Sequence, residues 1–226
     1  MLYEYCAENF TNLDAALRAG AGRIELCDNL SVGGTTPSVG VIEQAVSIVR
    51  EHEGAQIRAI IRPRKGNFVY SKAEFKAMET DIRVAAANGV DGVVIGCLKR
   101  RAGVKGAFDV DVEGLQRLMK VVRGVGEMRG RELGTTFHMA FDALDAKTQL
   151  EAIDLLADVG VDHILTHGGE AGTPIEDNFD QLRACIERAA GRLTILPGGG
   201  ITAANRDAVA DALGVDELHG TKIVKL

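Results

Sequence analysis

The sequence predicts an α/β protein: a single (β/α)₈ barrel, or TIM barrel, that lacks a full eighth helix. Eight short β-rich runs alternate with seven helical patterns over residues 1–226. Four related phrases, with glycine at 20, 89, 160 and 214, each end a helix directly before a strand. The strands that follow are continuous apolar runs, as expected for parallel strands buried on both faces. We therefore expect one TIM-barrel domain over the whole chain.

Each predicted strand is a short run of apolar and β-branched residues between turn signals. The eight strands are expected at Leu2–Cys6, Ile24–Cys27, Ile57–Ile61, Gly92–Ile95, Gly134–Phe137, His163–Thr166, Leu193–Leu196 and from Glu217 to His219. An open, doubly wound sheet is the alternative, and it usually has a glycine-rich turn after its first strand. Here residues 6–9 contain no glycine, which favours the barrel.

The helices are predicted from apolar residues on one face and from their start and stop signals. In the first, Leu13 and Leu17 share a face and Gly20 ends the helix. Pro37 suits the first turn of the second helix. The seven helices are expected at about Asn12–Ala19, Pro37–Arg50, Lys72–Ala87, Val112–Val122, Ala146–Asp158, Asn178–Ala190 and Ala203–Leu213, with a long insertion before the fourth.

Composition excludes several classes of function. The chain has 26 Lys and Arg against 32 Asp and Glu, a net charge of −6. We therefore expect no binding to nucleic acid or to an anionic membrane, since either needs a basic surface. No apolar run reaches the roughly 20 residues of a membrane span, and the start of the chain does not resemble a signal peptide. The four cysteines show no CxxC spacing, so we expect reduced thiols and a cytoplasmic protein.

Candidate metal ligands follow several of the predicted strands. In TIM barrels the chemistry takes place at the carboxyl ends of the strands, where His138, His167 and His219 are expected. Cys6 and Cys27 are expected at the ends of the first two strands. Imidazole and thiolate suit Zn, Cu and Ni, and thiolate favours Cu(I). The alternative is that both cysteines are buried core residues. We expect the neighbouring Met139 to point away from the lumen.

Other residues at the same end of the barrel predict an anion site. Arg62 and Arg64 are two residues apart, so in extended chain they would share a side and could bind carboxylate or phosphate. Gly198, Gly199 and Gly200 precede a helix after the seventh strand, where barrels often bind phosphate. The alternative for these glycines is loop geometry alone.

Acid–base groups are also expected in the barrel. Glu4 and Glu25 lie on adjacent predicted strands and could form a carboxylate pair inside the barrel, in which one carboxylate raises the pKa of the other. One of them could act as a base and His138 as an acid. Alternatively, Arg23 or Arg62 neutralises both carboxylates in a structural network.

Taken together, the motifs resemble the CutC family. The segments that carry the resemblance are RIELC at 23–27, GGTTPS at 33–38, IRPR at 61–64, FVYS at 68–71 and TFHMAFD at 136–142. The resemblance is collinear from Leu2 to about His219. It implies a (β/α)₈ barrel with a role in copper homeostasis. It also implies pocket positions at Glu4, Glu25, Arg62, Arg64, His138 and Asp142, with cysteines often found at the positions of Cys6 and Cys27.

Two functions follow as expectations. The first, implied by the resemblance, is a cytoplasmic copper-handling protein that binds Cu(I) through Cys6, Cys27, His167 or His219. The second is an enzyme that acts on a small anionic metabolite, such as a phosphorylated one, through the arginines and the glycine loop. The arginines favour the second function, because they attract an anion and repel a cation.

The predicted barrel lacks a helix over its last strand. Only seven residues follow His219, too few for a helix of average length. Exposed apolar surface of this kind is often covered by a second copy of the chain. We therefore predict a homodimer or higher homo-oligomer. The alternative is that the residues after His219 fold back and fill the gap.

Overall fold

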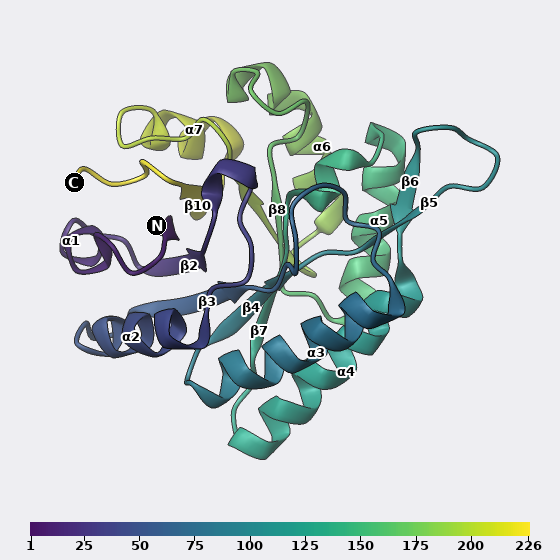
Figure 1. Cartoon of the computed structure of the whole chain (residues 1–226). Helices are drawn as coiled ribbons and strands as arrows, with labels where there is room; N and C mark the ends of the chain where they lie inside the picture. Colours follow the sequence, from purple (N-terminus) through teal and green to yellow (C-terminus); the bar gives the residue numbers. More distant parts are fainter.

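The computed structural model describes residues 1–226, and eight parallel strands form a nearly closed barrel with helices around it (Figure 1). The strands are β1 (Leu2–Glu8), β2 (Arg23–Cys27), β3 (Gln56–Ile60), β4 (Gly92–Ile95), β7 (Gly134–Phe137), β8 (His163–Thr166), β9 (Thr194–Pro197) and β10 (Glu217–Gly220). Their order is β10-β1-β2-β3-β4-β7-β8-β9, and β9 and β10 form no ladder with each other. The predicted TIM-barrel fold is confirmed.

Seven α-helices cover the outside of the barrel. They are α1 (Leu13–Arg18), α2 (Val39–Arg50), α3 (Lys72–Ala87), α4 (Val112–Arg129), α5 (Ala146–Val159), α6 (Phe179–Ala189) and α7 (Arg206–Leu213). The main difference from the prediction is α4, which continues past Val122 because Val125 and Gly126 extend its buried face. It ends where Gly130 takes a left-handed conformation, with φ of 66°. Short 3₁₀ helices follow β2 (η1, Leu30–Val32), β7 (η2, Met139–Ala143) and β8 (η3, Ile175–Asn178). No helix is both long and apolar enough to cross a bilayer.

The insertion before α4 forms an antiparallel hairpin, β5 (Leu98–Arg100) with β6 (Phe108–Val110). The hairpin and its loop project from the barrel (Figure 1). Arg101 attaches this projection to α5: its guanidinium donates to Asp109 at 2.8 Å and to Asp145, which caps α5, at 2.9 Å.

Alternation along the strands separates an apolar outer layer from a polar lumen. Ile24 and Leu26 of β2 pack into the main core under the helices. Arg23, Glu25 and Cys27 alternate with them and are also buried. Parallel pairing sets Glu4 opposite Arg23 in the register of β1 and β2. The lumen of the barrel is therefore built from charged groups that must find partners there.

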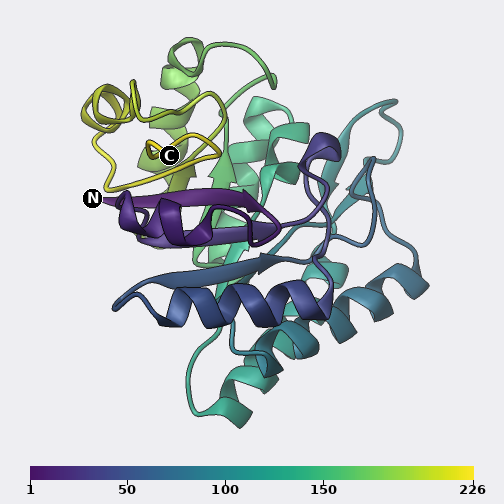
Figure 2. The ribbon, with the colours of Figure 1, turned by 60° about the vertical axis from the view of Figure 1, so that its left-hand side comes forward.

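The residues after β10 fold back over part of the gap that an eighth helix would cover. Ile223 and Val224 are buried in the main core. Lys222 forms a bridge with Thr202, and Arg206 donates to the Ile223 carbonyl at 2.7 Å. Because β1 pairs with β10, the two chain termini lie on the same side of the barrel in both views (Figures 1 and 2).

Candidate functional site at the mouth of the barrel

A pocket of about 450 Å³ opens at the carboxyl ends of the strands. It combines residues from β1, β2 and β10 with residues from the loops after β2, β3, β7 and β9. Of the candidates proposed from the sequence, those that line it are Cys6, Glu25, Cys27, Arg62, His138, Gly199, Gly200 and His219. Leu30, Ile60, Phe68 and Leu165 give it apolar walls. Segments far apart in the sequence thus form one site.

Two thiols and a carboxylate form a compact group in this pocket. One ligand atom from each of Cys6, Glu25 and Cys27 lies within 4.8 Å of the others, and all three residues are buried. Hydrogen bonding to Cys27 and burial raise the pKa of the Cys6 thiol well above its usual value. The hydrogen bond with Cys6 lowers the pKa of Cys27, but burial and nearby carboxylates outweigh it and raise that pKa to about 11. Both thiols are therefore protonated near pH 7.

Carboxylates surround the imidazole of His219. Its Nδ1 lies 2.8 Å from Glu4 Oε1, and its Nε2 lies 3.4 Å from Glu25 Oε2. Burial alone would lower the pKa of His219, but the carboxylates and Cys6 raise it well above 6.5. His219 is thus an imidazolium whose two N–H groups point at carboxylates. In this state neither nitrogen can coordinate a metal ion.

Arg23 neutralises the other side of Glu4, as one reading of the sequence allowed. Its Nε donates to the Glu4 carboxylate. Burial would raise the pKa of Glu4, but Arg23 and His219 hold it below its usual range. Burial raises the pKa of Glu25, which has no such guanidinium contact. Of the two carboxylates, Glu25 is therefore the better acceptor for a proton.

His138 is a neutral hydrogen-bond donor. Its Nδ1 accepts from the Ala140 backbone N–H at 3.1 Å, which leaves the proton on Nε2. Nε2 is buried and has no acceptor. Burial, followed by the charge of Arg62, lowers the pKa of His138 to about 3. The proposed role of His138 as an acid would need an imidazolium, whereas near pH 7 this side chain offers only a neutral N–H.

The two arginines do not share the pocket. Arg62 lines it, and its terminal nitrogens donate to the carbonyls of Val32, Gly34 and Gly66 at 2.7–3.0 Å. Arg64 is half-buried elsewhere and pairs with Glu74. The expectation of two guanidinium groups on one side is therefore wrong. The chain leaves the extended conformation of β3 after residue 60, so two-residue alternation no longer applies.

The glycine loop after β9 divides into two parts. Gly198 does not line the pocket, because its N–H donates to Thr166 O at 2.9 Å and its carbonyl lies 3.1 Å from His167 Nδ1. The N–H groups of Gly199, Gly200 and Ile201 have no acceptor in the protein, and these three residues line the pocket. In this loop the amides of Gly199, Gly200 and Ile201 are therefore the ones left free for a ligand.

His167 and Met139 differ from their expected roles. His167 does not line the pocket, because its imidazole lies between Gly198 O and Thr173 O, each at 3.1 Å. Met139 does line the pocket, so the expectation that it points away is wrong. It begins η2 directly after His138, and strand alternation ends there. Asp142 accepts from the His167 backbone N–H at 2.9 Å and so holds the loop after β8.

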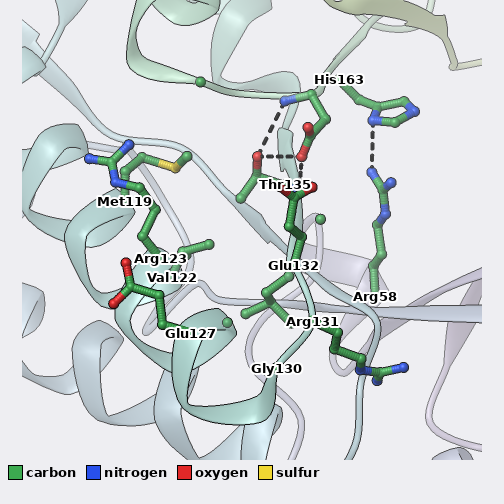
Figure 3. Close-up of a pocket in the computed structure, with 15 residues that line it drawn as sticks. Arg58, Met119, Val122, Arg123, Glu127, Gly130, Arg131, Glu132, Thr135 and His163 are labelled. Carbon is green, nitrogen blue, oxygen red and sulfur yellow. Dashed lines mark hydrogen bonds between the residues drawn. The ribbon is translucent and has the colours of Figure 1, made fainter.

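A second hollow, of about 740 Å³, lies at the amino ends of β7 and β8, opposite the mouth. Figure 3 shows the residues that line it. The end of α4 and the first residues of β7 and β8 surround it. Arg58 and His163 enter it from the lumen, with Arg58 Nη1 3.0 Å from His163 Nδ1. None of the candidates proposed from the sequence lines this hollow.

Comparison with known proteins decides the family, since a sequence model described as the CutC family matches residues 1–224. The chain belongs to the CutC family. An Enterococcus faecalis relative named as a family protein CutC is 52% identical over 224 residues, which cover 99% of this chain and 100% of the relative. A human relative named "Copper homeostasis protein cutC homolog" is 35% identical and is covered over 72% of its length, against 96% of this chain.

The fold of this CutC protein also matches a solved structure. A crystal structure of a CutC protein from Streptococcus agalactiae superimposes with a TM-score of 0.88 at 40% identity, over 99% of this chain and 100% of the other. The resemblance stated from the sequence motifs is thus confirmed. The names of the relatives associate the family with copper homeostasis.

Proposed function

We propose that this CutC protein binds Cu(I) through the thiols of Cys6 and Cys27. The observation that carries the proposal is the buried group of two sulfur atoms and a Glu25 oxygen within 4.8 Å. Soft thiolate ligands select Cu(I) over harder cations. The residues present therefore fit copper as a bound cargo, in keeping with the name of the human relative.

The imidazoles take a smaller part in this proposal. His219 would have to lose a proton before it could coordinate, and His167 is held by the carbonyls of Gly198 and Thr173. We therefore propose a site centred on the two thiols, with Glu25 beside them, and assign His219 to the charge balance of the lumen.

Competition with a Cu(I) chelator tests this function. The reduced protein is expected to remove one equivalent of Cu(I) from the chelator, and the double variant Cys6→Ser/Cys27→Ser to remove none. Cys185→Ser is the matched control, because Cys185 is also a buried free thiol but lies on α6, away from the pocket. If the wild-type protein fails to compete, or if the double variant competes equally well, the proposal is wrong.

A second function is favoured by the amides of Gly199, Gly200 and Ile201. We propose as an alternative that the protein is an enzyme whose pocket binds a small anionic metabolite, such as a phosphorylated one. The amides would hold the anionic group, with the charge of Arg62 close by. His138 would donate its neutral N–H to a second oxygen, and Glu25 would accept a proton. Arg64 and Gly198 have no role in this proposed site. The Arg64 guanidinium donates to the Asn67 carbonyl, and the Gly198 N–H donates to the Thr166 carbonyl.

Inorganic phosphate is the probe for this second function. We expect phosphate to shift the NMR resonances of the Gly199 and Gly200 amides. Arg62→Ala should weaken this binding more than Cys27→Ala does, since only the first removes a positive charge. Circular dichroism checks that both variants remain folded. Equal effects of the two substitutions would count against an anion site at the mouth.

A further inference from the structure

The second hollow contains an arginine for which three adjacent strands make room. Arg58 of β3 lies in register with Gly92 of β4, which lies in register with Gly134 of β7. A Cβ on Gly92 would lie 2.9 Å from Arg58 Cγ, and a Cβ on Gly134 would lie 3.2 Å from Arg58 Nη2. Because neither glycine has a side chain, the Arg58 side chain can lie against β4 and β7.

Only one side of the Arg58 guanidinium has partners in the protein. Nη1 donates to Thr136 Oγ1 at 2.6 Å and lies 3.0 Å from His163 Nδ1 (Figure 3). Nε and Nη2 have no acceptor, and both retain accessible surface although the residue is only 6% exposed. These two nitrogens form the edge of a guanidinium that pairs bidentately with carboxylate or phosphate.

The positive charge of Arg58 also lacks a contact partner. No carboxylate lies within ion-pair distance of it, and Glu4, Asp162 and Glu217 act only at longer range. Burial, with the charge of Arg23, lowers the pKa of Arg58. A buried cation in this position is costly unless an anion approaches it.

The other charged groups around the hollow are mostly engaged with neighbours. Arg131 pairs with Asp91 at 3.2 Å, and Asp162 accepts from the N–H and the hydroxyl of Thr135 at 2.7 and 2.9 Å. Arg123, at the exposed rim, donates one N–H to a backbone carbonyl.

Two carboxylates, those of Glu127 and Glu132, lie exposed at the rim without an ion pair. They would repel a polyanion, whereas the open edge of Arg58 attracts a single oxyanionic group. The charge pattern thus points to a small ligand and not to a nucleic-acid backbone.

We propose that this hollow is a second ligand site, in which the Nε–Nη2 edge of Arg58 binds the carboxylate or phosphate group of a small molecule. The site is independent of the functions proposed for the mouth, because it shares no residue with that pocket.

Titration with inorganic phosphate and, separately, with acetate tests the proposal and distinguishes the two ligand groups. We expect at least one of them to shift the NMR resonance of Arg58 Nε–H with a dissociation constant below about 10 mM. Gly134→Ala should weaken this binding by about tenfold or more, because the added methyl lies against the open edge. Gly124→Ala on α4 is the matched control, since a Cβ there meets nothing within 4 Å.

Arg58→Lys gives a second test that keeps the charge but lacks the bidentate edge, and thermal unfolding shows whether each variant is folded. The affinity of the Arg58→Lys variant for the anion is measured from the Gly134 and Thr135 amide resonances. It should fall about as far as the affinity of the Gly134→Ala variant. The proposal is wrong if neither probe shifts the Arg58 resonance below about 10 mM, or if Gly134→Ala binds as tightly as the wild type. Shifts confined to Gly199 and Gly200 would support the anion site at the mouth and contradict this one.

Discussion

Among single residues, the position of His138 depends on a glycine that leaves space for it. A Cβ on Gly96, which follows β4, would clash with the imidazole. Gly96→Ala should therefore displace the ring, break its bond with the Ala140 N–H, and cost about 1–3 kcal/mol of stability. Denaturant unfolding and the ¹⁵N shifts of His138 measure both effects. Gly40→Ala, where a Cβ meets nothing, is the control, and equal stabilities of the two variants would contradict the prediction.

The thiols give a prediction about pH. Cys6 and Cys27 are protonated near neutral pH, whereas Cu(I) binds thiolates, so binding must displace protons. Since the pKa of Cys27 is about 11, affinity should rise with pH throughout the neutral range. The gain is about tenfold per pH unit for each proton released. Chelator competition between about pH 6.5 and 8.5, corrected for the chelator, measures it. An affinity independent of pH would contradict protonated thiols.

The sequence predicts the direction of a side chain well when its residue lies inside a strand. Beyond the end of a strand the prediction is less accurate. Counting strands is enough to place Cys6, Glu25 and His219 in the lumen. It fails for Arg64 and Met139, because the chain has already left the strand and alternation no longer sets the direction of the side chain. The proton on His138 Nε2 follows from a backbone contact in η2, which no sequence pattern indicated.

Among the loops and strands around the mouth, the loops after β2 and β3 are joined by hydrogen bonds from Arg62. It donates to Val32 and Gly34 in the loop after β2 and to Gly66 in the loop after β3. Arg62→Ala should therefore speed amide hydrogen exchange over residues 29–36 and 64–69 together. Arg64→Ala, the matched control, should leave residues 29–36 unchanged, because its partners are the carbonyls of the second loop and Glu74 at the start of α3. If the two variants give the same exchange pattern, Arg62 does not couple the loops.

Most elements could be predicted because the apolar period changes clearly between strands and helices. The β5–β6 hairpin could not, since each of its strands has only three residues, too few to show an alternation that can be detected. The last helix begins at Arg206, three residues after the predicted start at Ala203. Thr202 N–H bonds to Asn205 Oδ1 at 2.7 Å, so a turn closed by side chains precedes the helix.

In the whole molecule, one chain of polar contacts runs through the lumen from the second hollow to the mouth. Arg58 contacts His163, which lies 3.2 Å from Glu217; Glu217 pairs with Arg23 at 2.8 Å. Arg23 then bonds to Glu4, which holds His219 at the mouth. The interior of this barrel is thus a network of charges and not an apolar core.

Acid should weaken this network. Burial would raise the pKa of Glu217, but His163 and Arg23 outweigh it and lower that pKa to about 2. The folded pKa lies below the usual value of 4.5, so the stabilisation is complete above about pH 4.5 and is lost as pH falls toward 2. A shift of this size corresponds to about 3 kcal/mol. Urea unfolding from pH 7 to 3 follows the larger part of this loss, and the remainder comes below pH 3 because the folded pKa is about 2.

Glu217→Gln is the control for this effect. The variant should be less stable at pH 7 and lose less stability on acidification than the wild type. Parallel pH profiles of the two proteins would show that Glu217 does not carry the effect.

The dimer predicted from the sequence remains a prediction, and the structure narrows where its contact would lie. Burial of Ile223 and Val224 already covers part of the apolar strip between α7 and α1. On the same flank Met1 and Leu226 are 59% and 62% exposed, so apolar side chains remain there for a two-fold partner to cover.

Sedimentation at micromolar concentration should show a species of about twice the chain mass of 24.0 kDa. Met1→Ser/Leu226→Ser should shift the equilibrium toward monomer, with Met128→Ser on the distant α4 as control, because that residue is also exposed. A single wild-type species of 24.0 kDa would show that the folded-back residues suffice to close the barrel.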